Sequence, residues 1–211
     1  MTKKGISVLS GSDNDLKHKF LDDGTSILGA NSPHSTHQIT GSVLVSGSTD
    51  ILGADFYSWT QKHPTTRPTA VIEIANAYDP DREVIVAFGG ATAAGVAQSQ
   101  TWEWDGQQWN QKSPATSPSA RRGLLQSMVY DPDRKVFVLF GGNLNNTTFY
   151  NETWEYDGTT WTQIVTATTP SSRTLASLVY DKVQKKVIMF GGATFGPTTP
   201  NNETWEYDGT D

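Results

Sequence analysis

Cysteine is absent from this chain of 211 residues, which excludes a disulfide framework, a thiol nucleophile and a thiolate metal site. Positive charge is also scarce, because 16 Lys plus Arg stand against 22 Asp plus Glu and give a formal net charge of -6. Such a chain has no basic stripe for nucleic acid. No apolar run approaches the roughly 18 residues of a membrane span, and the N-terminus lacks the apolar core of a signal peptide. We therefore expect no nucleic-acid partner and no membrane insertion.

The chain also has few histidines. The four histidines are His18, His34, His37 and His63. His34 and His37 have a spacing that could supply two metal ligands, but a third ligand is not close to them in the sequence. No Ser-His-Asp arrangement, phosphate loop or zinc spacing occurs either. The sequence therefore predicts no metal, no cofactor and no catalytic residues, so the protein is not expected to be an enzyme.

In place of such motifs the chain has an internal repeat. A Thr-Trp-Glu segment followed by Asp-Gly occurs three times, with its Trp at 102, 154 and 205. An apolar run ending in Gly-Gly precedes each copy, with its second Gly at 90, 142 and 192. Repeats with periods of about 20 to 50 residues are typical of solenoids, propellers and arrays. The repeat is therefore the organising feature of the chain.

Each repeat unit contains signals for four short strands. Residues 136–140 form a β-branched and aromatic run between Asp-Pro-Asp and Gly-Gly, which is typical of a buried strand. Residues 153–156 alternate aromatic and polar side chains, as a half-buried strand does. Asp157-Gly158 is a tight turn before a further strand that opens at Trp161. Apolar runs at 124–130 and 175–180 supply the first strand of their units, so each unit is expected to form one antiparallel sheet.

An apolar strand ending in Gly-Gly, followed by a Trp strand and a further Trp, resembles the kelch repeat family over residues 59–211. The resemblance implies an all-β fold of kelch-type β-propeller blades, as three four-stranded antiparallel units with an extended β-rich N-terminal arm. In kelch proteins the Gly pair ends the second strand where a Cβ would collide. The expected domains are an arm, 1–56, and a repeat region, 57–211. The expected units are about 59–108, 109–160 and 161–211.

The two ends of the repeat region match each other in register. Trp59-Thr60-Gln61-Lys62 resembles Trp109-Asn110-Gln111-Lys112, and after Asp211 the repeat would continue with the corresponding Trp. Propellers close in this way when an early strand completes the last blade. Propellers typically have four to eight blades, so three are too few. Either two chains combine as a homo-oligomer of six blades, or the chain is part of a larger propeller.

Residues 1–56 are rich in Gly, Ser, Thr and Asp, with short apolar groups such as 26–30 and 42–45. Strands this short need a partner surface. The segment from His37 to Ser48 is similar in style to the Ser/Gly-rich strand repeats of bacteriophage tail-fibre and virion proteins. This similarity implies docking on other virion proteins. A flexible tether would have a similar composition.

Residues that recur in every unit are expected to have structural roles, because a propeller has one active centre. Their carboxylates should cap turns and join blades, and their tryptophans should form the core. Binding is expected where the units differ, in the loops after Gly-Gly. The candidate ligand-binding residues are Asn143, Asn145, Asn146, Phe149, Tyr150, Phe195 and Asn201. Variable surface loops without a partner would look the same.

The function expected from these features is that of a non-enzymatic virion structural or adhesion protein of the fibre, tail or capsid-decoration type. Its partners would be other virion proteins through residues 1–56 and a host-surface glycan or protein through the propeller. The alternative is a cytoplasmic or extracellular kelch-repeat scaffold that binds proteins and carries a flexible tether. An enzyme is possible only if further blades outside this sequence supply the catalytic residues.

Overall fold

The computed structural model describes residues 18–20, 26–28, 59–194 and 199–210. The chain divides into two units, Met1–Ser58 and Trp59–Asp211, which are described separately. In the first unit, β1 (His18–Phe20) pairs antiparallel with β2 (Ser26–Leu28), and Lys19 lies opposite Ile27. The second apolar group singled out in this region, 42–45, and the metal-spaced histidines lie outside the described residues.

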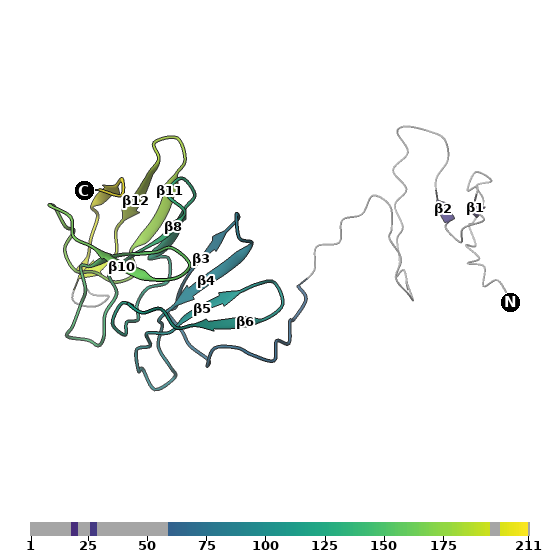
Figure 1. Ribbon diagram of the computed structural model, residues 1–211, viewed down its shortest axis with the longest axis horizontal. Helices are drawn as coiled ribbons and strands as arrows, with labels where there is room; N and C mark the ends of the chain where they lie inside the picture. Colours follow the sequence, from purple (N-terminus) through teal and green to yellow (C-terminus); the bar gives the residue numbers. More distant parts are fainter. Residues whose placement is uncertain (1–17, 21–25, 29–58, 195–198, 211) are drawn as a thin grey trace, which may run out of the picture. The chain divides into compact units, whose positions relative to one another are not determined.

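The second unit is all-β. Its first sheet, sheet 1, contains β3 (Ala75–Asp79), β4 (Val84–Phe88), β5 (Thr101–Trp104) and β6 (Trp109–Lys112) in chain order (Figure 1). Sheet 2 contains β7 (Met128–Asp131), β8 (Val136–Phe140), β9 (Thr153–Tyr156) and β10 (Trp161–Ile164). All neighbouring strands in both sheets are antiparallel. Each sheet is thus an antiparallel meander.

Sheet 3 has three strands, which corrects the expectation of three four-stranded units. It contains β11 (Ser177–Asp181), β12 (Lys186–Phe190) and β15 (Thr204–Tyr207), so β15 is its edge strand. A small hairpin of β13 (Ala193–Thr194) and β14 (Thr199–Pro200) lies between β12 and β15 in the chain. The strand that opens at a Trp closes the sheet before it, as β6 does on β5. The first strands of the sheets therefore begin about 16 to 19 residues after the starts of the units expected from the sequence.

The first hairpin of each sheet turns through an Asp-capped loop. Asp79 Oδ1 accepts hydrogen bonds from the backbone N–H of Asp81 at 2.9 Å and of Arg82 at 3.2 Å. Asp131 and Asp181 cap the equivalent turns in the same way. The residue that ends each turn has a positive φ, as Lys135 does at 58°. The aspartate side chain satisfies the turn's backbone donors and so makes this conformation accessible.

The Gly-Gly pairs end the second strands for a steric reason. Gly141 has φ 72°, and a Cβ at this position would lie 2.5 Å from the carbonyl oxygen of Arg173. The Gly141 N–H donates to Glu152 O, and the Gly142 N–H donates to Arg173 O. The pair therefore ends β8 where the segment leading to the next sheet passes directly over it, as the sequence predicted.

One expected strand is shorter than predicted. The apolar run 124–130 forms a strand only from Met128, because Ser127 N–H donates to Leu124 O in a turn and Leu125 has φ 40°.

The hydrophobic core lies between the sheets, whose first strands are neighbours: β3 lies beside β7, and β7 beside β11. Aromatic residues from all four strands of sheet 2 enter this core, among them Tyr130, Phe137, Tyr156 and Trp161.

Candidate functional site

The charged residues that recur in every unit are used by the scaffold. In sheet 1, Arg82 Nε lies 2.6 Å from Asp79 Oδ2, and Arg82 Nη1 lies 2.9 Å from Glu103 Oε1. Arg134 makes the same two ion pairs in sheet 2, with Asp131 and Glu155. Burial would raise the pKa of Asp79, but hydrogen bonds from Arg82 outweigh it and leave the pKa lowered. These carboxylates are therefore partners of arginines rather than free acids.

The same arginines also join neighbouring sheets. The Arg82 guanidinium lies 5.8 Å from the ring centroid of Phe137, and that of Arg134 lies 5.1 Å from the ring centroid of Tyr207. The Tyr207 hydroxyl donates to Glu155 Oε1 at 2.7 Å, from sheet 3 to sheet 2. The carboxylates of the Asp-Gly turns have a different role: Asp157 Oδ1 accepts from two backbone N–H groups of its own turn at 2.8 Å. The structural roles expected from recurrence are confirmed for these residues.

A second, deeper arginine supports each Gly-Gly loop of sheets 2 and 3. Arg121 is fully buried; it donates to Gly141 O at 3.0 Å and to Glu152 Oε2 at 2.7 Å. Arg173 donates to Gly191 O and Glu203 in the same pattern. Burial would raise the pKa of Glu152, but hydrogen bonds from Arg121 and Trp154 lower it. Tyr150 lies under this arginine, with its ring centroid 4.2 Å from the guanidinium carbon.

The tips of the loops after Gly-Gly form the candidate binding surface. The loop of sheet 1 closes through the Ala91–Ala97 bridge, and the loop of sheet 2 through the Asn143–Phe149 bridge. Arg122 connects the two loops: its Nη2 donates to Asn146 Oδ1 at 2.9 Å, and its Nη1 donates to Gly95 O at 3.4 Å. We define the loop-tip surface as Thr92–Val96, Arg122 and Leu144–Thr148.

The loop-tip surface combines polar and apolar groups. Val96 is 57% exposed and follows Gly95, whose carbonyl accepts from Arg122, and Leu144 is 40% exposed in the same loop as Asn146. A guanidinium, amides, hydroxyls and two exposed aliphatic side chains suit contact with a glycan or a protein.

Among the residues that the structure describes, no group of three His, Asp or Glu side chains could hold a metal ion. In the same residues no helix is long and apolar enough to cross a bilayer.

The structure places the seven candidate residues differently. Asn146 is exposed at the loop tip and bonded to Arg122. Asn145 is exposed as well, but its Oδ1 accepts from Thr147 and Thr148 within its own turn. Asn143 is buried, and its amide donates to Asn145 O at 2.7 Å. These three asparagines thus shape one loop, and Asn146 is the one that reaches outward.

The other four candidates are further from that surface or outside the description. Phe149 and Tyr150 are half-buried at the base of the loop, where Tyr150 contacts Arg121. Asn201 accepts from the Glu203 N–H at 2.7 Å and so supports the start of β15. Phe195 lies outside the described residues. A ligand role for the seven stays a prediction.

Arg122 was not among the candidate binding residues, although a comparison of the repeat units could have identified it. Backbone bridges show that Ile72, Arg122 and Thr174 occupy the same position in the three units, because each pairs with the residue after Gly-Gly. The three side chains differ in charge and size. A comparison of the units before their first strand, as well as after Gly-Gly, would have revealed this variable position.

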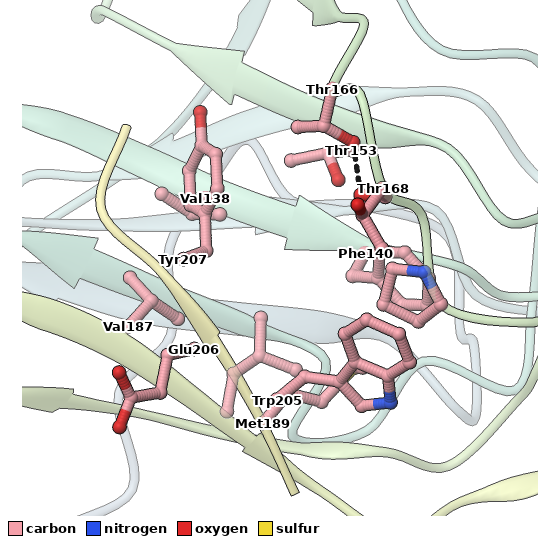
Figure 2. A pocket seen from close by; sticks show the side chains of 12 residues that line it. Val138, Phe140, Thr153, Thr166, Thr168, Val187, Met189, Trp205, Glu206 and Tyr207 are labelled. Atoms are coloured by element: carbon pink, nitrogen blue, oxygen red, sulfur yellow. Dashed lines mark hydrogen bonds between the residues drawn. The ribbon is translucent and has the colours of Figure 1, made fainter. Parts of the chain in front are cut away.

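A pocket lies between sheets 2 and 3, at the free edge of β15 (Figure 2). Phe140, Thr153, Met189, Trp205 and Tyr207 line it, together with Thr168 from the segment after β10. Figure 2 shows the rings of Phe140 and Trp205 on one side and the hydrogen bond from Thr166 Oγ1 to Thr168 O, which is 2.7 Å long. Trp205 is only partly buried, whereas its counterpart Trp154 is 7% exposed in sheet 2. The pocket therefore leaves the core of sheet 3 open at one edge.

Comparisons with known proteins support the fold and no more. The sequence matches no family model and no curated protein. Among solved structures, one titled "Structure of YjhT" resembles the chain with a TM-score of 0.51 at 14% sequence identity. The match covers 70% of this chain and 44% of that one, so the chain spans less than half of its length. A likeness at this identity indicates a similar arrangement of the backbone only.

Proposed function

We propose that residues 59–211 form blades of a kelch-type β-propeller that acts as a non-enzymatic binding module through its loop-tip surface. Three sheets with the same turn caps, the same Gly-Gly pairs and neighbouring first strands support the propeller. We further propose that residues 1–56 anchor this module in a virion, because their Ser/Gly-rich strand pattern is similar to that of virion proteins.

The observation that carries the binding role is the contrast between recurring and variable residues. The recurring carboxylates Glu103 and Glu155 are occupied by Arg82 and Arg134. The variable position Arg122 instead reaches the surface and connects two loops. Chemistry that is repeated in every unit holds the scaffold together, and the chemistry that differs lies where a partner can reach it.

Binding of the full chain to immobilised bacterial surface polysaccharide can be measured by biolayer interferometry. Replacing both Arg122 and Asn146 by Ala should weaken binding by at least about tenfold, because one such contact contributes about 1.4 kcal/mol or more. Gln163→Ala, an exposed change on β10, is the matched control. Equal binding by the double variant and the control would contradict the proposal, and so would cleavage or oxidation of the polysaccharide.

A protein partner is the alternative for the same surface. The exposed side chains of Val96 and Leu144 favour it, because they lie on the two loops that Arg122 connects and apolar groups gathered on a surface commonly mark protein contacts. Binding to surface protein that survives periodate oxidation of the glycans would select this alternative. Double replacement of Val96 and Leu144 by Ser should then reduce binding more than replacement of Arg122.

The anchoring role of residues 1–56 requires a separate test. A docked arm should resist protease between residues 10 and 50 in the intact assembly, whereas a flexible tether should be cut there. The isolated chain, digested under the same conditions, is the control. Rapid cleavage in both samples would rule out docking and leave the cellular scaffold as the better interpretation.

A further inference from the structure

The loop tip of sheet 2 uses the oxygen atoms of its two exposed asparagines for its own hydrogen bonds. Asn145 Oδ1 accepts from the Thr147 N–H at 2.9 Å, from the Thr147 hydroxyl at 2.8 Å and from the Thr148 N–H at 2.9 Å. Asn146 Oδ1 accepts from Arg122 Nη2 at 2.9 Å. These donors fix the orientation of both amides, because only the oxygen of an amide side chain can accept. The NH2 group of each asparagine therefore faces outward as a hydrogen-bond donor.

Arg122 adds further donors and a positive charge to the same surface. It donates to Asn146 Oδ1 and to Gly95 O, which are both neutral acceptors. Other arginines of the repeat region are paired with carboxylates, namely Arg82, Arg121, Arg134 and Arg173. Arg122 forms no ion pair with any residue that the structure describes. Because a guanidinium carries N–H groups on all three nitrogens, part of its donor capacity remains for a ligand.

Carboxylates that contact the residues on either side of Arg122 have other partners. Glu152 Oε2 accepts from Arg121 Nη2 at 2.7 Å, and Glu73 Oε2 accepts from the Gly123 N–H at 2.9 Å. The equivalent positions in the other two units are neutral, namely Ile72 and Thr174. The loop tips between sheets 1 and 2 thus present a local positive charge, in a chain whose formal net charge is -6.

A surface with unused donors and an uncompensated positive charge is complementary to a ligand with acceptors and a negative charge. An ionised carboxylate is planar and only accepts hydrogen bonds, and guanidinium N–H groups match its two oxygens. A single guanidinium balances a single carboxylate, whereas the negative net charge of the chain opposes the approach of a densely charged polyanion. The loop tips therefore favour a sugar that carries one acid group.

We infer that the loop-tip surface binds an acidic polysaccharide, with Arg122 on the carboxylate of a uronic-acid sugar and the NH2 groups of Asn145 and Asn146 on neighbouring oxygen atoms. This inference rests on the proposed binding function and adds the class of sugar to it. Two backbone hydrogen bonds with Asn143, at 2.8 and 2.9 Å, hold Arg122 in place, and its guanidinium is bonded to both loops. A side chain that is ordered before binding loses less freedom when the carboxylate arrives.

Removal of the carboxylates from the ligand tests this inference. A uronic-acid-containing capsular polysaccharide is immobilised before and after carbodiimide-activated borohydride reduction, which converts each carboxylate into a neutral alcohol. In biolayer interferometry, the full chain should bind the native polymer at least about tenfold more tightly than the reduced one. This difference should shrink as NaCl screens the charges.

The outcomes separate the sugar class from the binding function. Equal binding to the native and reduced polymers would overturn the inference and leave the proposed function intact. Tighter binding to dextran sulfate than to the native polymer would also overturn it, because the surface would then select dense negative charge. Binding to none of the three polymers would overturn both the inference and the proposed function.

Asn145→Asp reverses the outward hydrogen-bonding group with little change in the loop. Aspartate caps a turn of this kind elsewhere in the chain, where Asp157 Oδ1 accepts from the N–H groups of Thr159 and Thr160. The loop should therefore keep its shape, while the outward NH2 becomes a carboxylate oxygen that repels an acidic sugar. Binding to the native polymer should fall at least about tenfold, and binding to the reduced polymer should change far less. Thermal unfolding checks that the variant remains folded.

The charge of Arg122 is tested by Arg122→Gln and Arg122→Lys. The glutamine variant should bind the native and reduced polymers alike, whereas the lysine variant should retain part of the difference because it keeps the charge but not the planar fork. Lys182→Gln, which removes an exposed positive charge from the turn between β11 and β12, is the matched control. Equal losses in Lys182→Gln and Arg122→Gln would show that only the overall charge matters, and would overturn the inference.

Discussion

The indole nitrogen of Trp161 lies 2.9 Å from Thr101 Oγ1, and both atoms are buried. This hydrogen bond joins the fourth strand of sheet 2 to the third strand of sheet 1. The indole also stacks on Tyr156 with ring centroids 4.9 Å apart, so one side chain connects two sheets and closes its own. The contact between sheets 1 and 2 therefore depends on Trp161, a tryptophan that occurs at the same position of every repeat unit.

Thr101→Val should destabilise the protein by about 1 to 3 kcal/mol, because it leaves the Trp161 N–H buried without an acceptor. Trp161→Ala should cost about 3 to 5 kcal/mol, as large-to-small changes in a core do. Urea unfolding measures both. Thr162→Val, an exposed change on the same strand, should stay within about 0.5 kcal/mol of the unaltered protein. Equal effects of Thr101→Val and Thr162→Val would show that the hydrogen bond contributes nothing.

Gly141→Ala and Gly106→Ala separate backbone strain from steric collision. Both glycines have a positive φ, 72° and 90°, so Ala carries a strain of about 1 to 2 kcal/mol at either position. A Cβ on Gly141 would lie 2.5 Å from Arg173 O, whereas a Cβ on Gly106 meets nothing within 4 Å. We expect Gly141→Ala to cost about 1 to 3 kcal/mol more than Gly106→Ala in thermal or urea unfolding. Similar losses would mean that the Gly-Gly loop can move away from the segment above it.

The buried Arg121 and Glu152 should be energetically coupled, because sheet 1 has neutral residues in their places. Val71 precedes the bridging residue Ile72 as Arg121 precedes Arg122, and Gln100 accepts from Trp102 Nε1 as Glu152 accepts from Trp154 Nε1. Either single change, Arg121→Val or Glu152→Gln, should destabilise the protein by about 2 to 4 kcal/mol, because a charge loses its partner. The double variant copies sheet 1 and should cost less than the sum, with a coupling of about 1 to 3 kcal/mol in a double-mutant cycle. Simple additivity would contradict the prediction.

The strands and turns of the repeat region could be predicted from the sequence because local chemistry determines them. The run 136–140 and the alternating segment 153–156 form β8 and β9 with the expected bounds. Period-two alternation, Asp-Pro-Asp turns and Gly-Gly each act within a few residues. The expected grouping of four strands is found in sheet 2. The unit bounds 59–108, 109–160 and 161–211 do not match the sheets, because the strand at the start of a unit closes the preceding sheet, as the strand from Trp109 does in sheet 1.

The candidate binding surface was only partly predictable. Asn143 and Asn146 look alike in a sequence, yet one is buried and supports the loop while the other reaches the surface. Asn143 forms backbone bridges to Arg122, on a different segment, and to Phe149, and these hold it at the base of the loop. Sequence comparison between units can find variable positions, but only packing decides which of their side chains face outward.

Acid should weaken the fold through the arginine-bound carboxylates. Hydrogen bonds from Arg121 and Trp154 outweigh burial and lower the pKa of Glu152 below its ordinary value of 4.5; hydrogen bonds from Arg173 and Trp205 lower the pKa of Glu203. A carboxyl with a lowered pKa in the folded protein binds protons more readily when unfolded. Its stabilisation is therefore complete above about pH 4.5 and is lost as the pH falls through the folded-state value.

Urea unfolding midpoints should accordingly stay level between about pH 6 and 8 and fall steeply below about pH 4.5. Glu152→Gln should lower the midpoint at neutral pH and flatten this acid limb, because one titrating partner of an arginine is gone. Adding Glu203→Gln should flatten it further by an independent amount, since the two pairs belong to different sheets. Some slope will remain from Asp79, whose pKa is also lowered. An acid limb of unchanged slope in both variants would show that Arg121 and Arg173 do not stabilise the ionised carboxylates.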